Sequence, residues 1–291
     1  MHFQEHIYLA QFKDDFILLD TRKDKYTICS NQSSELFIRI IEKRKPFSEN
    51  GILTGRQLPV QNKVSSTSQF PLSALTKNHF SEEGDHLLAS AQQCSFQKEN
   101  HISQFSSQDL IVIQNLIEDR ILEKKDTPYP FYIDLKPNSC GVSNVDWRLP
   151  LENKKVHLNF SVLRVFMTLL QVNFFIKFRG LHATIQLIKK SRKNHLNYIV
   201  PQDEELENLA NLVNKACLIH PTRIKCLEWA ITYVLLALKQ KWKCNLEIGV
   251  QNYPFFAHAW VECAGKVVMD SQDLREGLSI ILNEPFRMLS I

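Results

Sequence analysis

Three residues in the last third of the chain have the types and the order that thiol-based acyl transfer requires. Cys226 lies at the head of an apolar segment, and His258 and Asp270 follow on segments whose pattern is typical of strands. A thiolate is a strong nucleophile, an imidazole can take up and return its proton, and a carboxylate can fix the orientation of the imidazole. The order helix, strand, strand therefore predicts that Cys226, His258 and Asp270 form a catalytic triad.

The segment 221–239 is expected to form the helix that carries the cysteine. Pro221 suits a first helical turn, which places Cys226 one to two turns into the helix. Aligned peptide dipoles at that end favour a thiolate over a thiol. The residues after Cys226 are apolar on nearly every side, so the helix is predicted to be buried.

The triad hypothesis requires a particular length of turn in the hairpin that follows this helix. Strands are expected at 244–251, 257–263 and 266–270. If residues 263–265 form a three-residue loop, His258 pairs with Asp270 and both side chains lie on one face. A two-residue loop would shift the alternation and separate them. The triad hypothesis therefore predicts the longer loop.

Other residues near these segments could compete for the same roles. Cys217 is the alternative nucleophile and Asp273 the alternative carboxylate, whereas Cys244 and Cys263 are expected to be structural. The chain has 7 cysteines and no Cys-x-x-Cys pair, so neither a disulfide framework nor a zinc finger is indicated. A metal site that combined Cys263 with the histidine and aspartate of the triad would be geometrically poor, and no metal is predicted.

Composition and charge indicate a globular protein of the cytoplasm. The chain is 44% hydrophobic with a formal net charge of +4, and its N-terminus lacks a basic region followed by an apolar stretch. We expect no secretory signal and a reducing compartment. The segment 158–178 is long and apolar enough to raise the question of a membrane, but Arg164 favours a core helix. The basic residues at 189–193 leave room for contact with a membrane surface.

The remaining pattern predicts an α+β chain in two parts. Short alternating runs in the first thirty residues indicate a three-stranded antiparallel meander, followed by a helix at 33–45. Residues from about 46 to 105 are rich in Ser, Gln and Asn and are interpreted as a low-complexity insertion. A helix at 107–123 follows, and four prolines between 126 and 150 indicate a linker. Further helices are expected at 160–178, 181–190 and 203–216.

The motif around the triad resembles a known family. The string runs from Cys226 through Gly249, His258-Ala-Trp-Val-Glu262 and Gly265 to Asp270. It is similar to the leader peptidases, or B proteins, of lasso-peptide biosynthesis, whose protease half is a papain- or transglutaminase-like cysteine protease. The resemblance covers 156–291, after a linker at 129–155. Residues 1–128 resemble the winged-helix-like, PqqD-like domain that recognises the precursor, here interrupted by the insertion.

The resemblance implies a division of labour between these parts. The N-terminal domain would bind the leader of a lasso-peptide precursor as an added strand, along Tyr26, Thr27, Ile28, Cys29 and Ser30. The C-terminal domain would cut the leader from the core peptide, and a separate cyclase resembling asparagine synthetase would use ATP to close the ring. This chain has no Gly-x-x-x-x-Gly-Lys-Ser/Thr loop, and we expect no cofactor.

Two alternatives keep parts of this interpretation. An amine could accept the thioester in place of water, which would make the protein a transglutaminase-like acyl transferase. A non-catalytic protein could instead use the N-terminal domain to bind a peptide or DNA. The acidic residues Asp109, Glu118, Asp119 and Glu123 on the helix at 107–123 disfavour contact with phosphates, so no nucleic-acid partner is expected.

Overall fold

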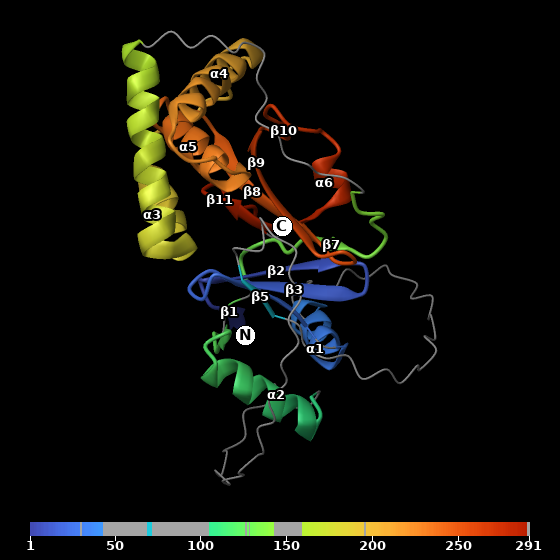
Figure 1. The fold of residues 1–291 in the computed structure, drawn as a ribbon. Coiled ribbons are helices and arrows are strands. Elements are labelled where there is room, and N and C mark those ends of the chain that lie inside the picture. The colour runs from blue at the N-terminus through green and yellow to red at the C-terminus, as the bar shows by residue number, and fades with distance from the viewer. Residues whose placement is uncertain are drawn as a thin grey trace.

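The computed structural model describes residues 1–29, 31–42, 69–71, 105–125, 127, 129–142, 159–194 and 196–289. Figure 1 shows a sheet in each half of the chain and helices packed around them. Among these residues the N-terminal sheet has five strands in the order β5-β4-β3-β2-β7, and the C-terminal sheet has four in the order β10-β9-β8-β11. The predicted α+β class is confirmed.

The N-terminal sheet is built around the predicted meander. β2 (Ile7–Phe12), β3 (Asp15–Asp20) and β4 (Lys25–Ile28) pair antiparallel in sequence order. β7 (Leu135–Lys136) adds parallel to β2, and β5 (Gln69–Pro71) adds antiparallel to β4. The two short edge strands come from the segments interpreted as linker and insertion. The rest of the insertion, apart from residue 105, lies outside the described residues.

Successive side chains of a strand point to opposite sides of the sheet. Both faces of this sheet are buried, each in a different core. One face packs with α1 (Asn31–Glu42) and α2 (Ser107–Glu118) in a small core. β1 (His2–Phe3) pairs with β6 (Leu122–Glu123) beside that core. The other face joins the large core of the C-terminal half through Tyr8, Ala10, Phe12, Ile17, Leu19 and Tyr26.

The helix α2 begins at a capping box. The hydroxyl of Ser106 accepts a hydrogen bond from the Asp109 N–H at 3.1 Å, and the Asp109 carboxylate accepts one from the Ser106 N–H at 2.9 Å. Such reciprocal bonds satisfy two donors that the helix itself cannot pair. The same carboxylate accepts hydrogen bonds from both terminal guanidinium nitrogens of Arg39, at 2.7 and 2.9 Å, and these bonds connect α2 to α1.

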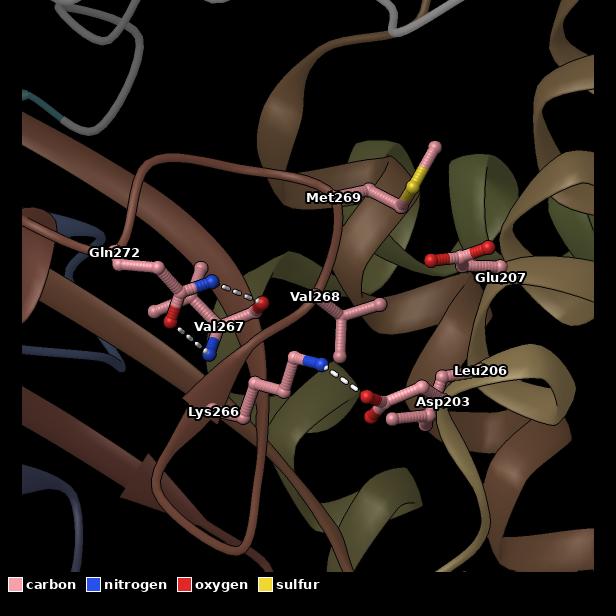
Figure 2. Close-up of a pocket in the computed structure, with 8 residues that line it drawn as sticks. All are labelled: Asp203, Leu206, Glu207, Lys266, Val267, Val268, Met269 and Gln272. Carbon is pink, nitrogen blue, oxygen red and sulfur yellow. Dashed lines mark hydrogen bonds and ion pairs between the residues drawn. The ribbon is translucent and has the colours of Figure 1, made fainter.

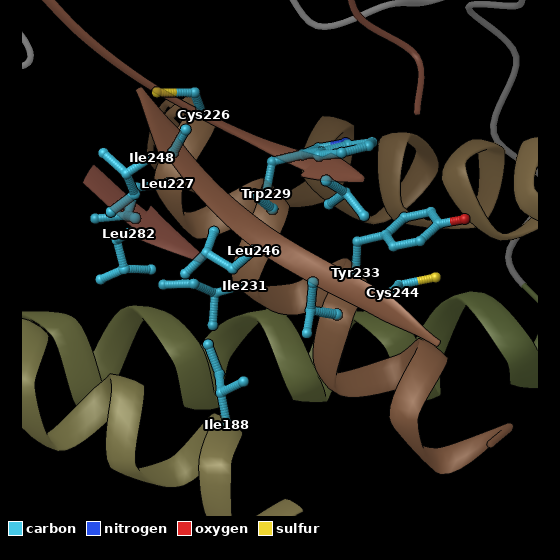
Figure 3. Packing of buried hydrophobic residues seen from close by; sticks show 14 of the residues in the cluster. Ile188, Cys226, Leu227, Trp229, Ile231, Tyr233, Cys244, Leu246, Ile248 and Leu282 are labelled. Atoms are coloured by element: carbon cyan, nitrogen blue, oxygen red, sulfur yellow. The ribbon is translucent and has the colours of Figure 1, made fainter. Parts of the chain in front are cut away.

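The C-terminal half places three helices against one face of its sheet. α3 (Phe160–Ser191), α4 (Asp203–Ile219) and α5 (Cys226–Lys239) pack together, and α5 lies closest to the strands. Figure 3 shows the apolar side chains of α5 packed between the sheet and α3. Almost every residue of α5 is buried, as its continuous apolar sequence predicted.

The strands of this half differ from the prediction at the end. β8 (Cys244–Gln251) agrees with it and β9 (Phe256–Cys263) begins one residue earlier, but β10 (Lys266–Val267) is shorter than expected. After the short helix α6 (Leu274–Gly277), the chain returns as β11 (Ser279–Glu284), which the sequence analysis missed. β11 pairs with β8 and also lies against β2 of the N-terminal sheet.

The two predicted helices at 160–178 and 181–190 meet at Gly180 within α3. Gly180 has φ 74°, a backbone conformation that residues other than glycine rarely adopt. A Cβ there would lie 2.9 Å from a carboxylate oxygen of Asp24, and that carboxylate accepts the Leu181 N–H at 3.0 Å. A carboxylate in the turn between β3 and β4 therefore binds the first N–H of the second part of α3.

The two halves share contacts that bury polar groups as well as apolar ones. The Tyr8 hydroxyl donates to Glu284 at 2.9 Å, and the Ser279 hydroxyl donates to the carbonyl of Gln11 at 2.6 Å. These pairs join β2 to β11 in the same place as the large apolar core. The predicted boundaries at 128 and 156 stay a prediction, since 143–158 lies outside the described residues.

Candidate active site

Cys226 is the first residue of α5, so it lies nearer the helix end than predicted. Lys225 is the N-cap of the helix, so Pro221 lies outside it. The Lys225 N–H donates to the Glu228 carboxylate at 3.1 Å, and the Lys225 carbonyl accepts the Trp229 N–H at 3.1 Å. A Glu three residues after a helix start is a sequence signal for this end. The first turn places the sulfur at the positive end of the helix dipole. Figure 3 shows Cys226 at one end of the packed cluster.

His258 lies on β9 within a row of aromatic rings. The rings of Phe256 and Trp260 have centroids 6.1 and 6.0 Å from that of His258 and are nearly parallel to it. The residue opposite His258 on β8 is Gly249. A Cβ on Gly249 would lie 2.6 Å from the Trp260 ring. Glycine at this position therefore makes the space in which Trp260 supports the imidazole.

Asp270 reaches His258 directly. The Nε2 atom of His258 lies 2.7 Å from Oδ2 of Asp270, and the histidine is 1% exposed. The same nitrogen and oxygen atoms form an ion pair when the imidazole is protonated. A buried imidazole and a carboxylate at this distance have the geometry of a base and its orienting group.

The contact is not made through the predicted turn, and the prediction of a three-residue loop was wrong. Cys263 pairs with Lys266, so the loop contains only Ala264 and Gly265. Their φ values of 51° and 86° are both positive. Two such residues are typical of a type I′ turn, which matches the twist of the strands it joins. The three-residue loop was predicted because, with Gly265 in the left-handed position, it would pair His258 with Asp270.

A second change of backbone direction restores the contact. In the observed register a continued strand would place Asp270 on the face opposite His258. β10 ends at Val267 instead, and Met269 has φ 55°. This left-handed residue breaks the alternation of the strand and turns Asp270 back toward the imidazole.

The segment that carries Asp270 is anchored on both sides. The Gln272 side chain accepts the Val267 N–H at 3.1 Å and donates to the Val267 carbonyl at 2.8 Å. Arg275 on α6 forms an ion pair with Glu262 on β9. These side chains fix the loop against β9, so the position of Asp270 depends on tertiary contacts that the spacing of the triad did not reveal.

The surroundings of His258 favour its charged form. Burial by itself lowers the pKa of the imidazole, but hydrogen bonds to Asp270 and to Cys226, with the charges of both, outweigh burial and raise the pKa to about 9. Asp270 contacts the Nε2 atom of this imidazole. A protonated imidazole between two acidic groups can stabilise a thiolate and later donate a proton.

Comparison with known proteins gave one family match and one relative. The family model of the transglutaminase-like superfamily matches residues 168–283, a range that includes the cysteine, the histidine and the aspartate. The microcin J25-processing protein McjB of Escherichia coli is 28% identical over 139 residues, which cover 46% of this chain and 64% of that protein. Together the findings support the predicted resemblance to lasso-peptide B proteins. No solved structure gave a significant match.

The N-terminal sheet extends a side chain toward the candidate active site. Tyr26 on β4 is 1% exposed, and its ring lies 5.3 Å from that of Phe255. Burial, and next the charge of Cys226, raise the pKa of the Tyr26 phenol. Its hydroxyl has no hydrogen-bond partner in the part of the chain that the structure describes. From the sequence, Tyr26 was predicted to act through its backbone. The only sequence signal for a side chain that reaches the candidate active site was an aromatic residue in a short strand.

The strand predicted to bind a leader has a neighbour at its outer edge. Residues 25–27 of β4 pair with β5 along its whole length. Tyr26, Thr27, Ile28 and Cys29 are described, whereas Ser30 lies outside the described residues. The edge that the sequence analysis expected to be open is thus occupied over three residues by the chain itself. The leader-binding role of this strand stays a prediction.

The competing residues lie away from the His258 imidazole. Burial, with a smaller effect of the Glu228 charge, raises the pKa of Cys217 to about 12, which keeps it a thiol near neutral pH. Asp273 contacts the Ser271 hydroxyl and not the histidine. Cys244 and Cys263 are buried and lie opposite each other on β8 and β9, in the large core. Among the described residues no three His, Cys, Asp or Glu side chains form a group that could hold a metal ion.

A small cavity lies beside the segment that carries Asp270. Its volume is about 180 Å³, and Figure 2 shows its walls coming from α4 and from the chain after the hairpin. Leu206, Val268 and Met269 give it apolar surface, and Lys266 forms an ion pair with Asp203 at 2.6 Å on its wall. Because Met269 directly precedes Asp270, the cavity and the triad share one loop.

Proposed function

We propose that this protein is a leader peptidase of lasso-peptide biosynthesis in which Cys226, His258 and Asp270 are the catalytic residues. The observation that carries the proposal is the 2.7 Å contact of His258 with Asp270. The pKa of the same imidazole is also raised by Cys226, which lies at a helix N-terminus. The superfamily match and the relative named as a processing protein support the same reaction class.

The proposed reaction follows from the charges at the site. The Cys226 thiolate attacks the carbonyl carbon of a peptide bond, and a C–S bond forms as the carbonyl oxygen becomes an oxyanion. The His258 imidazolium donates its proton to the leaving amine, and the C–N bond breaks to leave a thioester. The neutral imidazole then takes a proton from water, and the resulting hydroxide attacks the thioester carbon. A C–O bond forms and the C–S bond breaks, which releases the leader as an acid and restores the thiolate and the imidazolium. Asp270 holds the imidazole in place through both steps.

Binding of the leader is proposed at β4. An extended leader would pair with the main chain of this strand, which needs little side-chain recognition and suits a peptide without its own fold. Since β5 pairs with residues 25–27, the leader would have to replace β5 or pair beyond it. Tyr26 joins this strand to the surroundings of Cys226, so a peptide held at β4 would lie on the same side of the molecule as the nucleophile.

The cavity beside Asp270 is a proposed subsite for a substrate side chain. Its volume of about 180 Å³ can accept a side chain of moderate size, and its apolar walls favour one without charge. The released core peptide would pass to a separate cyclase resembling asparagine synthetase. That partner follows from the resemblance to the B proteins.

The test compares two buried cysteines on neighbouring helices. Cys226→Ala should abolish leader cleavage, measured by mass spectrometry of a precursor peptide, and should keep leader binding, measured by fluorescence anisotropy of a labelled leader. Cys217→Ala is the matched control and should retain cleavage, because Cys217 has no contact with the histidine and stays protonated. Cleavage by Cys226→Ala at the wild-type rate would eliminate the proposal.

The masses of the products separate hydrolysis from amine transfer. Hydrolysis gives a leader with a free carboxylate and a core peptide with a free amine. Transfer to an added primary amine would instead give a leader that carries that amine. A dominant amine adduct at low amine concentration would favour the transglutaminase-like acyl transferase.

A further inference from the structure

The first part of α3 has an exposed apolar stripe. Five large apolar residues on this helix are 53 to 82% exposed: Phe160, Leu163, Met167, Phe174 and Phe178. At about 100° per residue they fall within an arc of roughly 60°, along about 27 Å of helix. Most exposed apolar side chains on soluble proteins are scattered singly, and an ordered row marks an interaction surface.

The opposite side of the same helix is buried against the rest of the protein. Val165, Leu169 and Val172 are buried in the large core with α4 and α5, and Val162 on the same side is buried as well. Figure 1 shows α3 along the outer side of these two helices. The stripe ends at Gly180, after which Leu181, Ile185 and Ile188 are buried. The helix is therefore apolar on two sides, and only one of them is covered by described residues.

The flanks of the stripe are positively charged. At about 100° per residue, Arg164 and Lys177 lie about 40° to either side of the stripe, and Arg179 lies near its end but further round the helix. All three are exposed, and none of them forms an ion pair with a described residue. The helix from Phe160 to Ser191 contains no Asp or Glu at all. An apolar stripe with basic flanks and no acidic residue matches the interface of an anionic bilayer, where acyl chains lie beneath phosphate groups.

We propose that the stripe on α3 docks this protein onto an anionic phospholipid membrane, with α3 lying in the plane of the surface. The helix has the length and composition of a membrane span, yet its buried side chains belong to the core and cannot leave it without unfolding the C-terminal half. The phenylalanines therefore enter only the headgroup and upper acyl region, while the arginines and the lysine contact phosphates.

The test is co-sedimentation of the full chain with vesicles. The wild type should sediment with vesicles of phosphatidylcholine and phosphatidylglycerol, and it should bind vesicles of phosphatidylcholine alone much more weakly. Added salt should release it, because part of the attraction is between exposed charges. Replacing Phe174 and Phe178 by Gln should weaken binding on the order of 10-fold. Unfolding melts of each variant confirm that these exposed positions leave the fold intact.

A charge variant keeps the test independent of the apolar substitutions. Arg164→Gln, Lys177→Gln and Arg179→Gln together should weaken binding to the anionic vesicles on the order of 100-fold, since each basic residue near such a surface contributes about fivefold. The matched control carries the same charge change on another surface: Lys13→Gln, Arg120→Gln and Lys124→Gln. Ile111→Gln on α2, where Ile111 is 62% exposed, is the control for the phenylalanines. Both controls should bind as the wild type does.

Three results would overturn the proposal. Wild-type protein that stays in the supernatant has no membrane affinity. Equal binding to neutral and anionic vesicles removes the role of the basic flanks. A dimer in solution that Phe174→Gln and Phe178→Gln convert to a monomer, without vesicle binding, would show that a second copy covers the stripe.

Discussion

Replacing Asp270 by Asn tests whether the carboxylate holds His258 charged. Asparagine has nearly the same shape as aspartate but no negative charge, so the loop after β10 should keep its anchors through Gln272 and Arg275. The imidazolium would lose the charge nearest to it, at 2.7 Å. We expect the pKa of His258 to fall from about 9 toward its ordinary value.

The size of the effect follows from that pKa. Raising the pKa of a buried histidine from 6.5 to about 9 corresponds to roughly 3.5 kcal/mol, at about 1.4 kcal/mol for each pKa unit. Asp270 and Cys226 share this stabilisation, and the bond to Asp270 is the largest single favourable contribution. Between half and all of it lost from the transition state would slow cleavage roughly 20- to 300-fold.

The pH dependence gives a second, independent signature. A histidine whose folded pKa lies above its unfolded value contributes stability that is fully present below about 6.5 and lost as the pH rises through about 9. Wild-type activity and unfolding temperature should therefore both decline toward pH 9. In Asp270→Asn the decline in activity should begin near neutral pH, whereas the decline in unfolding temperature should become smaller, because the folded and unfolded pKa values of His258 would then nearly coincide.

Two assays measure these effects. Cleavage of a precursor peptide across a pH series gives the upper limit of the rate profile. Alkylation of Cys226 by iodoacetamide, followed peptide by peptide by mass spectrometry, reports the thiolate without any substrate. Asp273→Asn is the matched control, because Asp273 lies three residues away and does not contact His258. An unchanged upper pH limit in Asp270→Asn, or equal losses in the two variants, would refute the reasoning.

Two further substitutions test the support of the site. Gly249→Ala should destabilise the fold by about 1–3 kcal/mol and slow cleavage, because the new Cβ would lie 2.6 Å from the Trp260 ring that stacks on His258; an unchanged melting temperature would argue against close packing there. Tyr26→Phe should raise stability by about 1 kcal/mol in denaturant melts, because it removes a buried hydroxyl that no described residue pairs. It should leave leader binding unchanged, since recognition at β4 is through the main chain, and weaker binding would contradict that.

Local sequence signals were sufficient for most of the elements. The apolar run after Cys226 predicted a buried helix, and alternation predicted the meander and β8 and β9, because these patterns depend on periods of 3.6 and 2 residues. β11 was missed although its side chains are all buried. A strand buried on both faces has no alternation, so its sequence cannot be distinguished from other short apolar runs.

The residue types and order of the candidate triad are properties of the sequence, and so is the apolar helix that carries Cys226 near its N-terminal end. Whether His258 meets Asp270 was decided by tertiary structure. The two-residue turn alone would have separated them, and the positive φ of Met269 with the anchoring of the following loop brought them together. The occupied edge of β4 and the approach of Tyr26 to Cys226 were likewise invisible in the sequence. Each depends on contacts between residues far apart along the chain, and their geometry is set by the packing of the whole molecule.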